Sequence, residues 1–179
     1  GASPDGLPAT DGGHPSPQGC AMKIFRQTTE YALRGVGELA SRHSRGPVML
    51  EDLVEGTSLP RDFMAKIFQR LVAAGLLRSR KGRGGGFMFA RPSRRIKLTA
   101  VIEAIEGRRM NEQCSLGMGR CSEKAPCPQH DLYKPIRQRL RDYLANTTVA
   151  DLGEAVRVKR AWMDAAAKRR QRGRQPAGN

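Results

Sequence analysis

The chain has 179 residues, of which 39% are hydrophobic and only 5% aromatic, and it carries a formal net charge of +15. This length allows one domain with appendages. The charge favours a polyanionic partner, nucleic acid before a membrane surface. No apolar run approaches the roughly 20 residues that span a bilayer, and no signal peptide opens the chain. We therefore expect a cytoplasmic protein with no membrane partner.

The first 21 residues carry five Gly and four Pro without a helical or strand period, which predicts a disordered leader over residues 1–21. Apolar residues then recur at helical spacing from Thr28 to about His43. A second, short helix around Leu50 and Leu53 is expected to stop at Gly56. A third begins near residues 58–60 and ends at Gly75. Its predicted inner face consists of Phe63, Met64, Ile67, Phe68 and Leu71.

Two helices joined by a tight Gly-Thr-Ser turn form either a helix-turn-helix or an ordinary helical hairpin. The residues that follow favour the first, because Leu76 to Arg80 and Phe87 to Ala90 have the pattern of two strands around a glycine-rich turn. That turn lacks the Lys-Ser/Thr ending of a phosphate-binding loop and precedes a strand, which argues against nucleotide binding. We predict a β-hairpin wing.

Positive charge is concentrated on these elements, with eleven Lys or Arg and a single acid between Arg61 and Lys97. With the apolar face of the third helix turned inward, its long polar side chains remain outside for base edges or phosphates. The arginines of the wing suit a narrow minor groove. The predicted contacts to a double-stranded DNA operator are Arg61, Lys66, Gln69, Arg80, Lys81 and Arg83.

A fourth amphipathic helix ending at Gly107 completes a winged helix-turn-helix domain over residues 22–107. A cysteine-rich loop follows over residues 108–130, then a long helix over residues 129–152 and a basic tail over residues 153–179. The long helix carries Leu132, Ile136, Leu140 and Leu144 four residues apart. This narrow stripe fits a dimer seam or packing on its own domain. The predicted fold is mainly α with a small β-hairpin wing and a long dimerisation helix.

Three cysteines and a histidine lie within 17 residues: Cys114, Cys121, Cys127 and His130. In a reducing cytosol such clusters indicate metal ligands or redox groups before disulfides, although two disulfides would be possible in a secreted protein. The spacing is not that of a zinc ribbon. Three thiolates and an imidazole suit tetrahedral zinc and an iron–sulfur cluster about equally. Cys20, in the leader, is interpreted as an unligated bystander.

Several of these motifs together resemble the Rrf-two family of bacterial regulators: residues 22–25 and 30–34, the wing from Gly82 to Phe87, and the cysteine triplet. The resemblance covers Met22 to about Leu152. Iron–sulfur members of that family, of the IscR, RirA and NsrR types, sense cluster supply, iron or nitric oxide. The resemblance implies a dimeric winged helix with the cysteine loop between the DNA-binding domain and the dimerisation helix.

The same resemblance implies that Cys114, Cys121 and Cys127 bind an iron–sulfur cluster of the 4Fe–4S or 2Fe–2S type. Its fourth ligand would be His130, as in cluster-supply sensors, or Glu30 of the other subunit, as in nitric-oxide sensors. We therefore expect a homodimeric transcriptional regulator controlled by a cluster, and no enzyme. The alternative is a winged-helix regulator whose triplet binds zinc or acts as a thiol redox switch. A small electron carrier would not need the wing.

Overall fold

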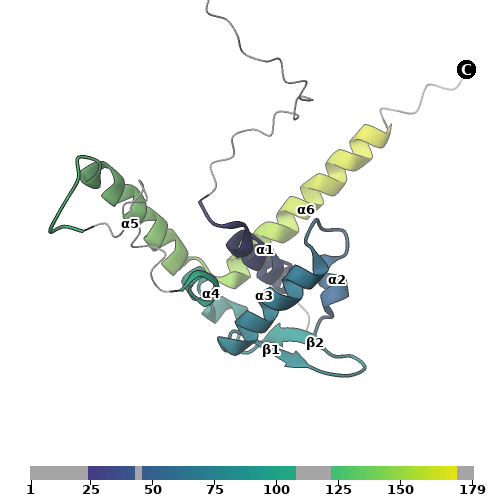
Figure 1. The fold of residues 1–179 in the computed structure, drawn as a ribbon. Helices are drawn as coiled ribbons and strands as arrows, with labels where there is room; N and C mark the ends of the chain where they lie inside the picture. Colours follow the sequence, from purple (N-terminus) through teal and green to yellow (C-terminus); the bar gives the residue numbers. More distant parts are fainter. Residues whose placement is uncertain (1–23, 43–45, 108–121, 173–179) are drawn as a thin grey trace, which may run out of the picture.

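The computed structural model describes residues 24–42, 46–107 and 122–172, and its helices and one hairpin follow the predicted order (Figure 1). The winged domain contains α1 (Gln27–Ser41), α2 (Leu50–Val54), α3 (Arg61–Ala73), β1 (Leu77–Arg80), β2 (Gly86–Phe89), η1 (Ser93–Arg95) and α4 (Leu98–Glu106). Two helices follow, α5 (His130–Asn146) and α6 (Val149–Arg172). The prediction of a mainly helical chain with a small β-hairpin wing is confirmed.

The core forms where the apolar faces of α1, α3 and α4 meet. On α3 the predicted inner face is buried at Met64, Ile67, Phe68 and Leu71. Phe63 is the exception, because 38% of it is exposed and its ring lies edge-on to Tyr31, with centroids 5.7 Å apart. Residue 63 stands at the margin of the apolar stripe, where a helical side chain reaches the surface between two helices rather than the core.

Helix α1 lies against both α3 and α6, and small residues allow the close approach. A Cβ atom at Gly35 would lie 2.3 Å from the Cε atom of Met64 on α3. One at Gly153 of α6 would lie 2.6 Å from the Cβ atom of Ala40. At Gly153 a side chain would also meet backbone atoms of α1, so glycine is needed there, whereas at Gly35 the Met64 and Phe68 side chains would have to move.

The wing is an antiparallel hairpin in which Leu77 pairs with Phe89 and Arg80 with Gly86. Its second strand is also bridged to the segment before α2, because the N–H of Val48 donates to the carbonyl of Phe87 at 2.9 Å and the reverse bond is 2.8 Å. Gly86 has φ of 131°, and a Cβ there would meet the carbonyl oxygen of Val48 at 2.2 Å. Glycine is thus required where the wing joins the domain.

The end of the chain is divided differently from the expected helix over residues 129–152 and tail over residues 153–179. Helix α5 ends at Asn146, and α6 starts at Val149 and continues to Arg172, well into the expected tail. A capping box starts the new helix: the N–H and hydroxyl of Thr148 donate to Asp151 at 2.8 and 2.7 Å, and the N–H of Asp151 donates back at 3.2 Å.

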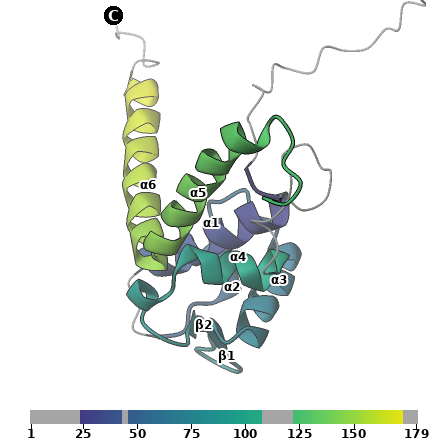
Figure 2. The same ribbon diagram turned by 90° about the vertical axis from the view of Figure 1, so that its left-hand side faces the viewer.

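The corner between α5 and α6 is fastened to the start of α4. The N–H of Leu98 donates to the carbonyl of Thr147 at 3.0 Å, and the N–H of Val149 donates to the carbonyl of Ile96 at 2.8 Å. Leu144 and Val149, on either side of the corner, are both fully buried. From this anchored corner α5 and α6 diverge as two arms above the winged domain (Figure 2).

Candidate nucleic-acid interface and cysteine site

The turn between α2 and α3 sets the angle of the helix-turn-helix. The hydroxyl of Thr57 donates to the carbonyl of Val54 at 2.7 Å and accepts the N–H of Leu59 at 3.2 Å. Leu59 itself is buried at 6% exposure, and Gly56 has φ of 67°, a left-handed conformation that glycine adopts without strain. The turn therefore fixes the orientation of α3 relative to α2, so that the exposed face of α3 is turned outward.

The outer face of α3 carries Arg61, Lys66 and Gln69, all exposed as the sequence predicts. Arg61 is also tied to α2, because its Nε donates to Glu51 at 2.9 Å and its Nη1 lies 3.2 Å from Asp62. The Glu51 carboxylate raises the pKa of Arg61. The pKa of Glu51 is lowered, first by a backbone hydrogen bond at its own position and then by Arg61. Arg61 thus forms an ion pair between α3 and α2. Lys66 and Gln69 are therefore the more available side chains for contacts with DNA.

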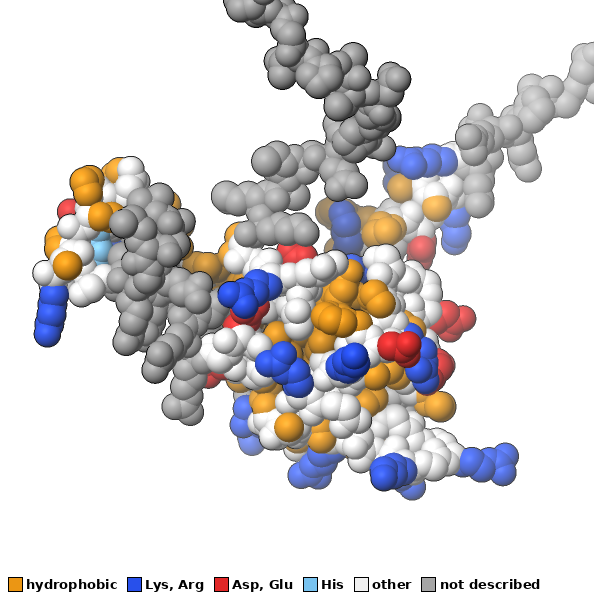
Figure 3. All heavy atoms as spheres, viewed as in Figure 1, with side chains coloured by type: hydrophobic (Ala, Val, Ile, Leu, Met, Phe, Trp, Pro, Cys, Tyr) orange, Lys and Arg blue, Asp and Glu red, His pale blue; other side chains and the backbone are white. Residues whose placement is uncertain are grey.

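At the wing, Arg80, Lys81 and Arg83 are all exposed. Figure 3 shows Lys and Arg side chains along the lower part of this face, including the projecting wing. The structure adds Arg78, exposed on β1 two residues before Arg80 and so on the same face of the hairpin. Strand alternation could have identified Arg78 from the sequence. Arg94 and Arg95 on η1, which follows the wing in sequence, are also exposed and basic, and they were not among the predicted contacts.

Of the predicted cysteine ligands, Cys114 and Cys121 lie outside the described residues. Cys127 is exposed, and its carbonyl accepts the N–H of His130 at 2.8 Å, so it stands at the start of α5. The His130 ring is buried, with Nε2 3.4 Å from Glu123. Glu123 also pairs with Lys134 at 2.7 Å, and this hydrogen bond is the main cause of its lowered pKa.

Glu30 lies partly buried in the first turn of α1. Within the part of the chain that the structure describes, no three His, Cys, Asp or Glu side chains gather into a metal site, so one subunit does not bring Glu30, Cys127 and His130 together. The residue before Glu30, Thr29, is held by a hydrogen bond. Its hydroxyl donates to the carboxylate of Glu106, at the end of α4, at 2.5 Å.

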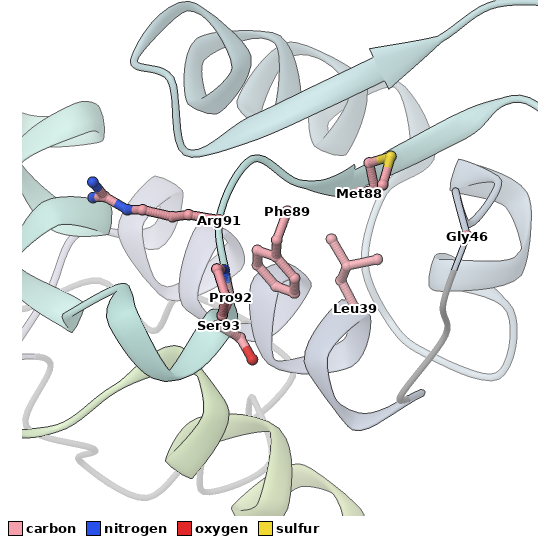
Figure 4. Close-up of a pocket in the computed structure, with 7 residues that line it drawn as sticks. All are labelled: Leu39, Gly46, Met88, Phe89, Arg91, Pro92 and Ser93. Atoms are coloured by element: carbon pink, nitrogen blue, oxygen red, sulfur yellow. The ribbon is translucent and has the colours of Figure 1, made fainter.

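A pocket of about 240 Å³ lies behind the wing, lined by Leu39, Gly46, Met88, Phe89, Arg91, Pro92 and Ser93 (Figure 4). Four of the seven lining residues have apolar side chains, and the guanidinium of Arg91 points away from Leu39 and Phe89 (Figure 4). A ligand site usually has a few convergent polar groups. Polar side chains do not converge among these seven residues, so we assign no small-molecule site to this pocket.

These features can be compared with known proteins. The model of the Rrf2 family, described as an iron-dependent transcriptional regulator, matches residues 25–155. The chain belongs to the Rrf2 family. The resemblance inferred from its motifs is therefore confirmed, and the chain is a transcriptional regulator of the helix-turn-helix type rather than an enzyme. No helix in the described ranges is both long and apolar enough to span a membrane.

Relatives named as helix-turn-helix transcriptional regulators are similar in sequence to most of this Rrf2 chain. One from Neisseria meningitidis is 32% identical over 132 residues, which span 73% of this chain and 88% of the relative. IscR of Erwinia tasmaniensis is 30% identical over 122 residues, which span 68% of this chain and 73% of the relative. The family model, which matches residues 25–155, spans both the winged domain and the cysteine segment.

Solved structures share the fold. CymR of Bacillus subtilis, described as the global cysteine regulator, superposes with a TM-score of 0.64 at 24% identity, over 75% of this chain and 98% of CymR. IscR of T. potens gives 0.60 at 22% identity, over 77% of this chain and 91% of that protein. The oxidized form of Staphylococcus aureus CymR gives 0.58 at 28% identity, over 74% and 97% respectively.

Proposed function

We propose that this Rrf2 regulator is a homodimer that binds a near-palindromic DNA operator and changes its affinity when Cys114, Cys121 and Cys127 bind an iron–sulfur cluster. The observation that carries this proposal is the position of the cysteine segment. It joins the end of α4 in the winged domain to the start of α5, the helix with the exposed apolar stripe, and Cys127 stands directly at that start. A change in this segment would act on the spacing of two DNA-reading domains.

The homodimer is supported by the exposure of α5. Leu132 is 66% exposed, Ile136 63% and Tyr143 54%, which is a large apolar surface for a helix that projects from its own domain. Leu144 behaves differently from the expected seam, because it is fully buried against its own domain at the anchored corner. We therefore assign the proposed seam to Leu132, Ile136 and Tyr143. Leu140 is partly buried against the chain's own core, and Leu144 is an intrachain anchor.

The donor set fits an iron–sulfur cluster. Three thiolates with one nitrogen or oxygen ligand suit a soft iron centre, and the exposed Cys127 is accessible for assembly. The fourth ligand is either His130, the first residue of α5 and three residues after Cys127, or Glu30 from the partner chain. When bound, the cluster would supply a redox-active centre. Its binding free energy would be available to hold the three cysteines in one arrangement.

A second candidate keeps the winged-helix regulator and replaces the cluster with a thiol switch or a zinc ion. The exposed Cys127 thiol favours it, since accessible thiolates are the ones that oxidise reversibly. The two candidates differ in colour, because an iron–sulfur protein absorbs visible light whereas a zinc or disulfide form does not.

The test is purification without oxygen, followed by visible spectroscopy and by counts of iron, acid-labile sulfide and zinc per chain. Operator affinity is then measured for the loaded protein, the cluster-free protein and Cys121→Ala. We expect a coloured protein whose absorption and operator affinity both change in Cys121→Ala. Glu30→Ala and His130→Ala identify the fourth ligand, because only loss of a ligand shifts the spectrum or makes the cluster labile. A colourless, zinc-containing protein, or identical operator affinity in all three forms, would reject cluster control.

A further inference from the structure

The last turn of α4 contacts both α3, which is the proposed recognition helix, and the start of α1. Only Gly107 separates this turn from the cysteine segment (residues 108–130). The carbonyl of Ile105 accepts a hydrogen bond from Nη2 of Arg70, in the last turn of α3, at 2.7 Å. The carboxylate of the next residue, Glu106, accepts the hydroxyl of Thr29 at 2.5 Å and lies 3.4 Å from Nε of Arg26. Gly107, with φ of 82°, then ends the helix.

The contact between Thr29 and Glu106 is shielded from water, whereas Arg26 and Arg70 approach the last turn of α4 from the exposed surface. Thr29 is fully buried, and the side chain of Glu106 is only 8% exposed. A buried carboxylate is costly unless charged or hydrogen-bonding groups compensate it, and here a hydroxyl and a guanidinium do so. The Arg70 guanidinium satisfies a carbonyl that the end of a helix leaves without an intrahelical partner, and its positive charge suits the negative end of the helix dipole.

The recognition helix is linked to this turn from both of its ends. Arg70 ties the C-terminal end of α3 directly to Ile105. The N-terminal end is reached through α1, where Tyr31, two residues after Thr29, packs its ring against Phe63 at 5.7 Å. Because the two α4 contacts come from adjacent residues, any rewinding of the last turn of α4 would move the Ile105 carbonyl and the Glu106 carboxylate together.

We propose that Glu106 and Arg70 are positioning residues that couple the state of the cysteine segment to the recognition helix. This inference rests on the proposed function, since it assumes that operator affinity responds to that segment. Glu106 transmits a change to α1, which carries Glu30, and Arg70 transmits it to α3. Neither residue is proposed as a cluster ligand. Residues that only stabilised the fold would lower stability but leave the response of operator affinity unchanged.

The experiment uses the full chain and compares operator Kd between the cluster-loaded and cluster-free forms, with Cys121→Ser as an independent unloaded state. The variants are Glu106→Gln, which removes the charge, Thr29→Val, which removes the donor, and Arg70→Met. Glu103→Gln is the matched control, because Glu103 is exposed one turn earlier on the same helix. Arg70→Lys and Thr29→Ser keep a cation and a hydroxyl respectively, and serve as conservative rescues.

For the wild type and Glu103→Gln we expect the same ratio of Kd values, within the range of about 5- to 150-fold that is usual for allosteric coupling. In Glu106→Gln, Thr29→Val and Arg70→Met the ratio should fall to about twofold or less, with partial recovery in the conservative variants. Amide hydrogen exchange on the cluster-free protein gives a second readout. Exchange at residues 27–31 should rise in Glu106→Gln and not in Glu103→Gln.

The outcomes are separable. If the wild-type ratio is one, the proposed function and this coupling are both rejected. If the wild-type ratio is large and the variants keep it in full, the coupling alone is rejected and cluster control stands. A residue that merely contacts DNA would shift both Kd values by one factor and leave their ratio unchanged. That result in Arg70→Met would reject the proposed role of Arg70.

Discussion

Arg160 of α6 forms an ion pair with Glu38 of α1, with Nη2 and Oε2 2.6 Å apart, and the Glu38 side chain is only 9% exposed. The contact is an ion pair rather than an aligned hydrogen bond. Arg160 lies beyond residue 155, where the match to the Rrf2 family model ends, whereas Glu38 lies within the matched range. The later part of α6 is therefore attached to the winged domain by an ion pair whose carboxylate, Glu38, is buried in α1. A buried charge without a partner is costly, so the pair is expected to stabilise this attachment.

Replacing Arg160 with alanine should destabilise the protein by about 1–3 kcal/mol, because it leaves the buried Glu38 carboxylate without its cation. The loss should be smaller than for a fully buried pair, since Arg160 is 40% exposed. Urea unfolding of the purified protein measures it. Arg157→Ala is the control, because Arg157 pairs with the exposed Glu154 on the same helix and its loss should have little effect. Equal effects would show that the Glu38 contact adds nothing.

Gly86→Ala should disrupt the wing. The backbone φ of 131° is strained for any other residue, and the new Cβ would collide with the carbonyl oxygen of Val48. We expect a loss of about 1–3 kcal/mol in unfolding free energy together with weaker operator binding. Gly84→Ala is the matched control, because it has φ of 69° with open space around it and should cost about 1 kcal/mol. Calorimetry measures the loss of stability in both variants, and fluorescence anisotropy measures their operator affinity. Gly86→Ala should lose more of both than Gly84→Ala.

Operator binding should weaken steeply with added salt, because Lys and Arg of α3 and the wing displace counterions from the phosphates. Arg83→Ala should weaken binding to most sequences and reduce the salt slope by about 1, whereas Lys66→Ala or Gln69→Ala should change the preference among operators. Lys159→Ala, exposed on α6, is the control and should leave both unchanged. Anisotropy titrations at several salt concentrations measure the slope. A salt-independent affinity would contradict this placement of the interface.

The capping box at Thr148 and Asp151 predicts a pH dependence. Hydrogen bonds from the Thr148 hydroxyl, and then from its backbone N–H, lower the pKa of Asp151 in the folded chain below its unfolded value. Its stabilising effect is therefore fully present above the unfolded pKa of about 3.9 and disappears as the pH falls through the folded pKa. Asp151→Asn should be less stable than wild type at neutral pH, and the difference should shrink below about pH 4. Asp164→Asn, exposed on the same helix, should show no such trend in thermal unfolding.

Most of the winged domain could be predicted from the sequence, because its elements have local signals. The apolar period of α3, the glycines of the wing and Gly75 and Gly107 after α3 and α4 place these elements to within a few residues. Phe63 was misplaced because periodicity does not show where a stripe ends. Its exposure depends on the distance to Tyr31, which belongs to another helix.

The division between α5 and α6 had a local signal that the leucine stripe concealed. Thr148 and Asp151 form a capping box that starts α6, whereas the predicted boundaries placed one helix over residues 129–152 and a tail from residue 153. The role of Leu144 could not be derived from spacing, since a stripe that pairs subunits and one that packs inward have the same period. Similarly, the contacts of Glu106 with Thr29 join residues 77 apart and have no sequence signature. Both require the tertiary arrangement.

The position of Leu144 gives a sharp test of the proposed dimer. Ile136 is 63% exposed and Leu132 66%, so Asp at either position should leave the fold of a single subunit intact. If α5 pairs two subunits, Ile136→Asp combined with Leu132→Asp should produce folded monomers with weak operator binding, since each monomer then reaches one half-site only. Leu144→Asp, in contrast, should unfold the protein, because it buries a charge at the α5–α6 corner. Sedimentation equilibrium and circular dichroism on the double variant and on Leu144→Asp separate the cases. A double variant that remains dimeric would place the interface elsewhere, and the exposed apolar residues Trp162 and Met163 of α6 would be the next surface to test.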